Sequence, residues 1–277
     1  MLPTVKIGNK DVTRLSIGGN PFSGNSHVSP ELDWEMTRYY TMPRLQAALD
    51  ECWRQGINTC QSRGDRHQTR MYLEHRENRG QLQWIVQTAT ELSDIKNNIR
   101  DVARFGPIAI YNHGTHTDNA WHSGKIKNIR EIVKWIKDKG LLAGVGSHVP
   151  EVIQYMEDKG WETDFYMCCF YNLARGFKTA PFAEQNAYAR EQYPAGDPAR
   201  MCETIRRVKK PCIAFKILAA SRACKTPETV RAAIQFALHN IKPTDIVNVG
   251  VFQRDKNQIA ENAQTVREIL SAKNGLG

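Results

Sequence analysis

The stretch YNHGTHTDNAWHSG, residues 111–124, places three histidines and one aspartate among small polar residues. Imidazole and carboxylate groups can act as general acids and bases, or they can bind a divalent metal ion. The stretch follows the apolar run GPIAI and precedes a strongly helical segment. We interpret it as a polar loop with His116 and His122 on its surface. His113, at the end of the apolar run, is the histidine expected to reach a site.

Other chemically competent residues also follow short apolar runs. His148 comes after LLAGVGS, Gln61 after INTC and Lys216 after PCIAF. A lysine is costly to bury without a partner, so we expect Lys216 to be paired, to face a substrate or to be reactive. If the runs are neighbouring strands of one sheet, these side chains share one edge.

Helical segments alternate with these apolar runs along the chain. Isoleucines and a valine within residues 129–136 recur on one helical face, and Gly140 follows where a C-cap belongs. Thr226 followed by Pro227 predicts the start of another helix. The strands are apolar on both faces, as is typical of parallel strands covered by helices.

About eight strand–helix units fit into 277 residues, which is the (β/α)₈ pattern. A doubly wound sheet is the competing architecture, but IGGNPFSGNS after the first such strand does not match G-x-G-x-x-G. The segment TVKIGNKDVTRL predicts a hairpin around Asn9. We therefore predict an α/β fold, a (β/α)₈ TIM barrel with an N-terminal β-hairpin, forming one domain over residues 1–277.

The active site of this fold lies where the strands end and the βα loops begin. We predict that His113, His148, Lys216 and Gln61 are catalytic. Further residues at or near strand ends are predicted to bind substrate, and these are Arg63, Asn20, Glu91, Trp121 and Tyr171.

The composition narrows the possible partners. The formal net charge is +9, but the basic residues are dispersed and no nucleic-acid-binding motif is present, so we expect no nucleic-acid partner. No apolar run approaches the ~18 residues that span a bilayer, and the N-terminus lacks the pattern of a signal peptide. The seven scattered cysteines indicate reduced thiols. These features predict a cytoplasmic protein without a membrane partner, while a removed leader stays open.

An ordered set of segments resembles the aldo-keto reductase superfamily over most of the chain. The set includes RLSIGGN, ECWRQGIN, IYNHG, GVGSHVPEVI, FYN and VNVGVFQRDKNQIAENAQTV. The last segment is similar to the family's phosphate-binding strand and helix, which end in Glu261 and Asn262 here. The resemblance implies an NADP site, for which Gly250, Arg254 and Asn262 are the matching residues, with Lys256 able to hold a phosphate.

The chain departs from the family at the catalytic positions. The resemblance implies an Asp, a Tyr, a Lys and a His, in which the Tyr donates a proton while NADPH delivers hydride. Gln61 stands at the Asp position, SRGDRHQ offers no tyrosine, and Ala89 replaces the Lys. Only the His remains, as His113, and His148 stands where the family's Asn binds the nicotinamide carboxamide.

Replacement of several groups that serve one hydride transfer favours different chemistry. We predict a non-redox lyase or isomerase acting on a small, sugar-like carbonyl compound. His113 or His148 would abstract a proton beside the carbonyl, and Lys216 or a metal would stabilise the enolate. A divalent metal bound by His113 and His148 is the expected cofactor. Two alternatives stay open: an atypical NADP-dependent oxidoreductase, and a non-catalytic barrel that binds a metabolite or a partner protein.

Overall fold

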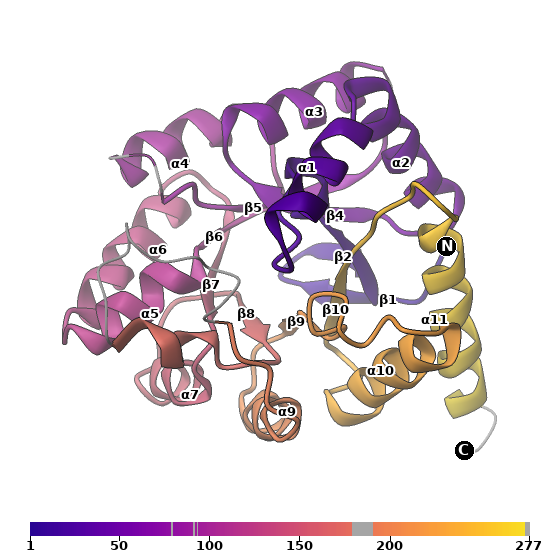
Figure 1. Ribbon diagram of the computed structural model, residues 1–277. Helices are drawn as coiled ribbons and strands as arrows, with labels where there is room; N and C mark the ends of the chain where they lie inside the picture. Colours follow the sequence, from indigo (N-terminus) through magenta and orange to yellow (C-terminus); the bar gives the residue numbers. More distant parts are fainter. Residues whose placement is uncertain (79, 91, 93, 179–190, 275–277) are drawn as a thin grey trace.

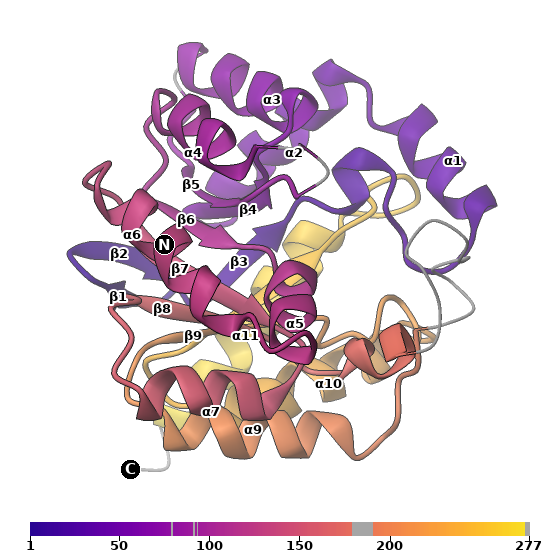
Figure 2. The same cartoon turned by 90° about the vertical axis from the view of Figure 1, so that its left-hand side faces the viewer.

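The computed structural model describes residues 1–78, 80–90, 92, 94–178 and 191–274. The chain begins with an antiparallel hairpin of β1 (Thr4–Ile7) and β2 (Lys10–Thr13). Ile7 and Val12 are fully buried and pack against the apolar side chains inside the barrel. The hairpin therefore closes one end of the barrel, opposite the end where α1 (Pro30–Tyr39) lies, as Figure 2 shows.

Eight parallel strands form a closed barrel in the order β10-β3-β4-β5-β6-β7-β8-β9. Closure leaves the sheet of these described strands without a free edge, and it brings their carboxyl ends to one mouth. The predicted TIM barrel with an N-terminal hairpin is thereby confirmed. The strands are β3 (Leu15–Gly18), β4 (Thr59–Arg63), β5 (Gln83–Gln87), β6 (Ala109–Asn112), β7 (Leu142–Ser147), β8 (Phe165–Cys169), β9 (Cys212–Phe215) and β10 (Ile246–Gly250).

Helices surround the barrel as an outer ring (Figure 1). The helices that follow α1 are α2 (Met42–Arg54), α3 (Arg66–Glu77), α4 (Ile95–Ala103), α5 (Gly114–His122), α6 (Ile129–Lys137), α7 (Pro150–Asp158), α9 (Asp197–Arg207), α10 (Pro227–Asn240) and α11 (Gln258–Asn274). Short 3₁₀ helices lie at η1 (Pro21–Ser23), η2 (Ile126–Asn128) and η3 (Leu173–Lys178). None of the described helices combines the length and apolar character that crossing a bilayer requires.

Two helical predictions are confirmed in detail. Helix α6 buries Ile129, Ile132, Val133 and Ile136, and the left-handed Gly140 follows it with a φ of 72°. Thr226 caps α10 by accepting a hydrogen bond from the Thr229 amide, and Pro227 occupies the first turn.

The prediction of a polar loop after His113 was wrong, because Gly114–His122 forms α5. The segment is weakly helical by composition, and no side chain caps its start. Its helical form depends on buried partners instead: Thr117 accepts a hydrogen bond from Asn112, and Asp118 bonds to residues at the end of β7. His116 is half-buried within this helix rather than on a loop, whereas His122 at its end is exposed.

Candidate active site

The alternation of side chains along the strands brings polar groups to the inside of the barrel mouth. Tyr111 and Ile85 belong to the buried cluster inside the barrel. Gln61 pairs with Ile85 and Gln87 pairs with Tyr111, so these glutamines also point inward. Two residues further along, nearer the mouth, the next inward-facing positions are those of Arg63, Ala89, His113 and His148.

His148 is oriented by a buried carboxylate. Its Nδ1 atom lies 2.7 Å from Oδ2 of Asp118, a side chain with no solvent exposure. Asp118 also accepts hydrogen bonds from the Ser147 hydroxyl and from the His148 amide. A carboxylate bonded to Nδ1–H leaves Nε2 as the basic nitrogen, which is the arrangement of an Asp–His general base.

His113 is held between two threonines and stays uncharged. Its ring Nδ1 lies 3.0 Å from the Thr90 hydroxyl, and its amide donates to the Thr88 hydroxyl. Burial lowers the pKa of His113 to about 3, with the positive charges of His148, Arg63, His116 and Lys216 adding to the effect. His113 is therefore a neutral imidazole at physiological pH, able to accept or donate a hydrogen bond but not to carry charge.

Lys216 is paired, in agreement with one of its predicted roles. Its Nζ lies 3.2 and 3.3 Å from the two carboxylate oxygens of Glu191 and 3.4 Å from the Tyr193 hydroxyl. Burial raises the pKa of Glu191, but the hydrogen bond from His27 and the charge of Lys216 outweigh it and lower the pKa below its ordinary value. Burial also lowers the pKa of Lys216, which Glu191 partly opposes. The site thus contains an ion pair with little solvent exposure.

A chain of hydrogen bonds lies beneath the imidazoles. The Ser16 hydroxyl donates to Oδ1 of Asn248, and Nδ2 of Asn248 donates to Oε1 of Gln61. Nε2 of Gln61 donates to the Tyr111 hydroxyl over 2.8 Å, and that hydroxyl donates to Oε1 of Gln87 over 2.9 Å. All side chains in this series of hydrogen bonds are uncharged, because four of them are amides or a serine and burial raises the pKa of Tyr111 far above its ordinary value.

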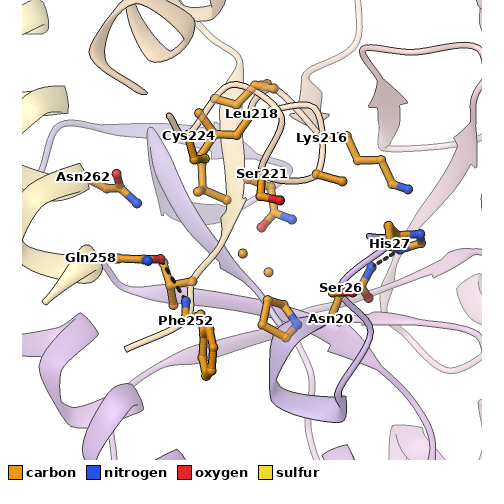
Figure 3. A pocket seen from close by; sticks show the side chains of 18 of the residues that line it. Asn20, Ser26, His27, Lys216, Leu218, Ser221, Cys224, Phe252, Gln258 and Asn262 are labelled. Atoms are coloured by element: carbon orange, nitrogen blue, oxygen red, sulfur yellow. Dashed lines mark hydrogen bonds between the residues drawn. The ribbon is translucent and has the colours of Figure 1, made fainter. Parts of the chain in front are cut away.

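A cavity of about 460 Å³ opens above these hydrogen-bonded side chains, between β9, β10 and the loop after β3. Gln61, Gln87, Tyr111 and Asn248 line its inner end. Figure 3 shows His27 and Lys216 on one side, with Gln258 and Asn262 of α11 on the other. The loop that carries Leu218, Ser221 and Cys224 lies between the two sides. His113 and His148 do not line this cavity, but the ring of His148 packs edge-on against Phe215, which does.

Known proteins share this fold without sharing the sequence. No model of a protein family matches the chain, and no curated protein matches it. The aldo-keto reductase AKR11C1 from Bacillus halodurans (holo form) is 13% identical with a TM-score of 0.62, covering 98% of this chain and 96% of that one. A truncated 3-deoxy-D-arabino-heptulosonate 7-phosphate synthase from Thermotoga maritima is 10% identical with a TM-score of 0.57, covering 100% and 94%.

The Yersinia pestis dihydropteroate synthase is also similar in fold, at 8% identity and a TM-score of 0.53, covering 98% of both chains. Identities this low show the fold alone. Aldo-keto reductases are among the similar structures, but synthases match as well, so the likeness does not single out the superfamily suggested by the sequence segments.

The residues predicted to bind a nucleotide are only partly brought together. Gly250 and Asn262 line the cavity; Asn262 is 5% exposed, and its side chain makes no hydrogen bond to another described residue. Lys256 lines it too, although it pairs with Glu261. Arg254 does not line the cavity, because it forms ion pairs with Glu35 and Asp255 at the surface. Of the residues predicted to bind a nucleotide, Gly250 and Asn262 therefore lie at the cavity and Arg254 does not.

The described residues include no group of three or more histidines, cysteines or acidic residues that could hold a metal ion. Structural and catalytic zinc sites use three or four protein ligands. The Nδ1 of His148, one of the two predicted ligands, is already occupied by Asp118. The metal site at His113 and His148 stays a prediction.

The residues predicted to bind substrate are divided between the cavity and its surroundings. Asn20 lines the cavity and lies 3.1 Å from Nε2 of His27. Arg63 points into the mouth beside Asp65. The ring of Tyr171 packs on Tyr193, close to Lys216. Trp121 packs on Tyr155 of α7 and does not line the cavity, and Glu91 lies outside the described residues.

Sequence reasoning missed several residues of the site, among them Tyr111, Asn248 and Glu191, and it also missed the orienting role of Asp118. Tyr111 could have been predicted from the sequence, because it lies two positions before His113 and therefore points inward with it. Asn248 is likewise two positions before Gly250. Glu191 had no such signal, since its partners His27 and Lys216 are distant in the chain.

Proposed function

We propose that the protein is a non-redox enzyme that removes a proton beside the carbonyl of a small, sugar-like compound, followed by isomerisation or elimination. The observation that carries this proposal is the hydrogen bond between Nδ1 of His148 and the buried Asp118 carboxylate. It fixes the tautomer in which Nε2 of His148 accepts a proton, and it stabilises the imidazolium that results.

The surrounding groups support the same chemistry. His113 is neutral and lies near enough to His148 for the charge of one to act on the pKa of the other. The Lys216 ammonium adds positive charge near the imidazoles, where it would stabilise an enolate electrostatically. Uncharged amides and a phenol at the inner end of the cavity suit the hydroxyl groups of a sugar, because such groups both donate and accept hydrogen bonds.

Exchange of a substrate proton for solvent deuterium tests this function directly. The purified protein is incubated in D₂O with dihydroxyacetone, fructose, tagatose and sugars oxidised at one ring carbon, and loss of the signal of the proton beside the carbonyl is followed by NMR. We expect exchange with at least one compound, and a ~10²–10⁴-fold slower rate in His148→Asn. His122→Asn, an exposed histidine of the same helix as Asp118, is the matched control. No exchange with any compound, or an unchanged rate in His148→Asn, contradicts the proposal.

A second candidate is an NADP-dependent oxidoreductase, favoured by one observation. Asn262 is buried, and its side chain makes no hydrogen bond to a described residue and points into the cavity (Figure 3). Asn262, Gly250 and the lysines of the cavity wall would hold the nucleotide, and NADPH would supply hydride. Titration of the protein with NADPH, monitored by protein fluorescence, tests the candidate. Micromolar binding that weakens in Asn262→Ala supports it, and the absence of binding at millimolar NADPH removes it.

A further inference from the structure

The direction of the buried hydrogen-bond chain determines where the proton of Tyr111 can point. Oε1 of Gln61 accepts from Asn248, so the Nε2 end of Gln61 faces the phenol oxygen and donates to it. The Tyr111 proton therefore cannot be directed at Gln61. It is directed at Gln87, whose side chain is half-buried on the wall of the cavity.

Tyr111 also has the chemical character of a preorganised donor. A phenol oxygen that receives a hydrogen bond is a stronger donor, because the received bond stabilises the charge left on that oxygen. The hydroxyl lies at the inner end of the cavity, in a water-poor part of the barrel, where a fixed donor is worth more than in water. The strand places His113 directly above it, since the two residues are two positions apart on one inward face.

We propose that the Tyr111 hydroxyl binds the substrate's carbonyl oxygen and stabilises it as it becomes an enolate, with the carbonyl oxygen replacing Gln87 as the acceptor. The inference rests on the proposed proton abstraction. In that step the substrate extends from Tyr111 past the cavity residue Phe215, against which the ring of His148 packs, and His148 takes the proton. The electron pair of the broken C–H bond forms the C=C bond, and the carbonyl π pair moves onto oxygen. Tyr111 keeps its proton and shares it with that oxygen. Return of a proton, or of a deuteron in D₂O, restores the carbonyl compound.

Tyr111→Phe is the deciding variant, because it removes only the hydroxyl and keeps the ring that packs edge-on against Phe165. Tyr166→Phe is its matched control. Tyr166 is also a buried strand tyrosine whose hydroxyl is hydrogen-bonded, to Glu157, but it points outward from the barrel. Both variants are first compared with the wild-type protein by circular dichroism and thermal unfolding.

The exchange of substrate protons in D₂O then separates the outcomes. We expect Tyr111→Phe to exchange ~10²–10³-fold more slowly at saturating substrate, the effect of losing one oxyanion donor, while Tyr166→Phe stays within about threefold of the wild type. If His148→Asn is slow but a folded Tyr111→Phe is as fast as the wild type, the role of Tyr111 is overturned while the proposed function stands. If the wild type shows no exchange, both are overturned. If Tyr111→Phe does not fold, Tyr111→His takes its place, because an imidazole N–H can donate from the same position. An exchange rate within tenfold of the wild type then supports the donor role of Tyr111. A larger loss overturns it.

Discussion

The Nδ1 atom of His148 lies 2.7 Å from the Oδ2 atom of Asp118, and both side chains are buried. The carboxylate therefore does not merely neutralise a surface charge. It decides which nitrogen of the imidazole carries the proton, and with it which nitrogen can act as a base.

Asp118→Asn should slow proton abstraction by about 10²–10⁴-fold with little change in KM, because an asparagine amide can donate to Nδ1 and stabilise the wrong tautomer. The measurement is the rate of solvent deuterium exchange across substrate concentrations. Asp138→Asn, which loses only an exposed ion pair with Lys134, is the control. A drop in kcat no larger than that of the control would contradict the role of Asp118.

Because His113 is buried, its protonation makes the free energy of unfolding depend on pH. The pKa of His113 is about 3 in the folded protein, against an ordinary value of 6.5. Between these values the unfolded chain binds the proton and the folded protein does not, so the free energy of unfolding rises with pH, by at most about 1.4 kcal/mol per pH unit from this residue. Above pH 6.5 the contribution is constant.

His113→Asn should therefore flatten the pH dependence of stability below pH 6.5. Urea unfolding at pH 4, 5, 6 and 7 measures the free energy of unfolding of both proteins. Their difference should change with pH below 6.5 and stay constant above it. Parallel curves over the whole range would show that His113 can be protonated in the folded protein.

The fold was predictable because it depends on patterns that repeat along the chain. The isoleucines of α6 recur at helical spacing, and the Thr226 cap is a local contact between neighbouring residues. Helix α5 was not predictable in this way, since glycine, threonine and histidine favour it little and its stability comes from Asn112 and residues of β7. The same holds for the site: strand ends indicated His113 and His148, but a loop distant in the sequence supplies Glu191.

Replacing one partner of the Lys216–Glu191 ion pair should lower the free energy of unfolding more than replacing both partners together. Lys216→Met leaves Glu191 with His27 and the Tyr193 hydroxyl but without a permanent positive charge, and Glu191→Gln leaves a poorly solvated ammonium. Each single variant should lose up to about 3 kcal/mol of stability, because an uncompensated buried charge remains. The double variant should lose less than the sum of the two, with a coupling of at least about 1 kcal/mol. Urea unfolding of all four proteins completes the cycle, and strictly additive losses would mean that the pair contributes nothing.

Substitution of Ala220 by glycine should stabilise the protein, against the usual direction of that change. Ala219, Ala220 and Ser221, in the loop that lines the cavity, have positive φ angles, and that of Ala220 is 47°. A left-handed backbone costs a non-glycine residue about 1–2 kcal/mol, whereas the added freedom of glycine in the unfolded chain costs about 0.4–1 kcal/mol. Ala220→Gly should therefore raise the free energy of unfolding by about 0.5–1 kcal/mol. Ala232→Gly, an exposed position within α10, should lower it by about 0.5–1 kcal/mol. Thermal and urea unfolding of the two variants compare the signs, and a loss of stability in Ala220→Gly would show that the loop is not strained at this residue.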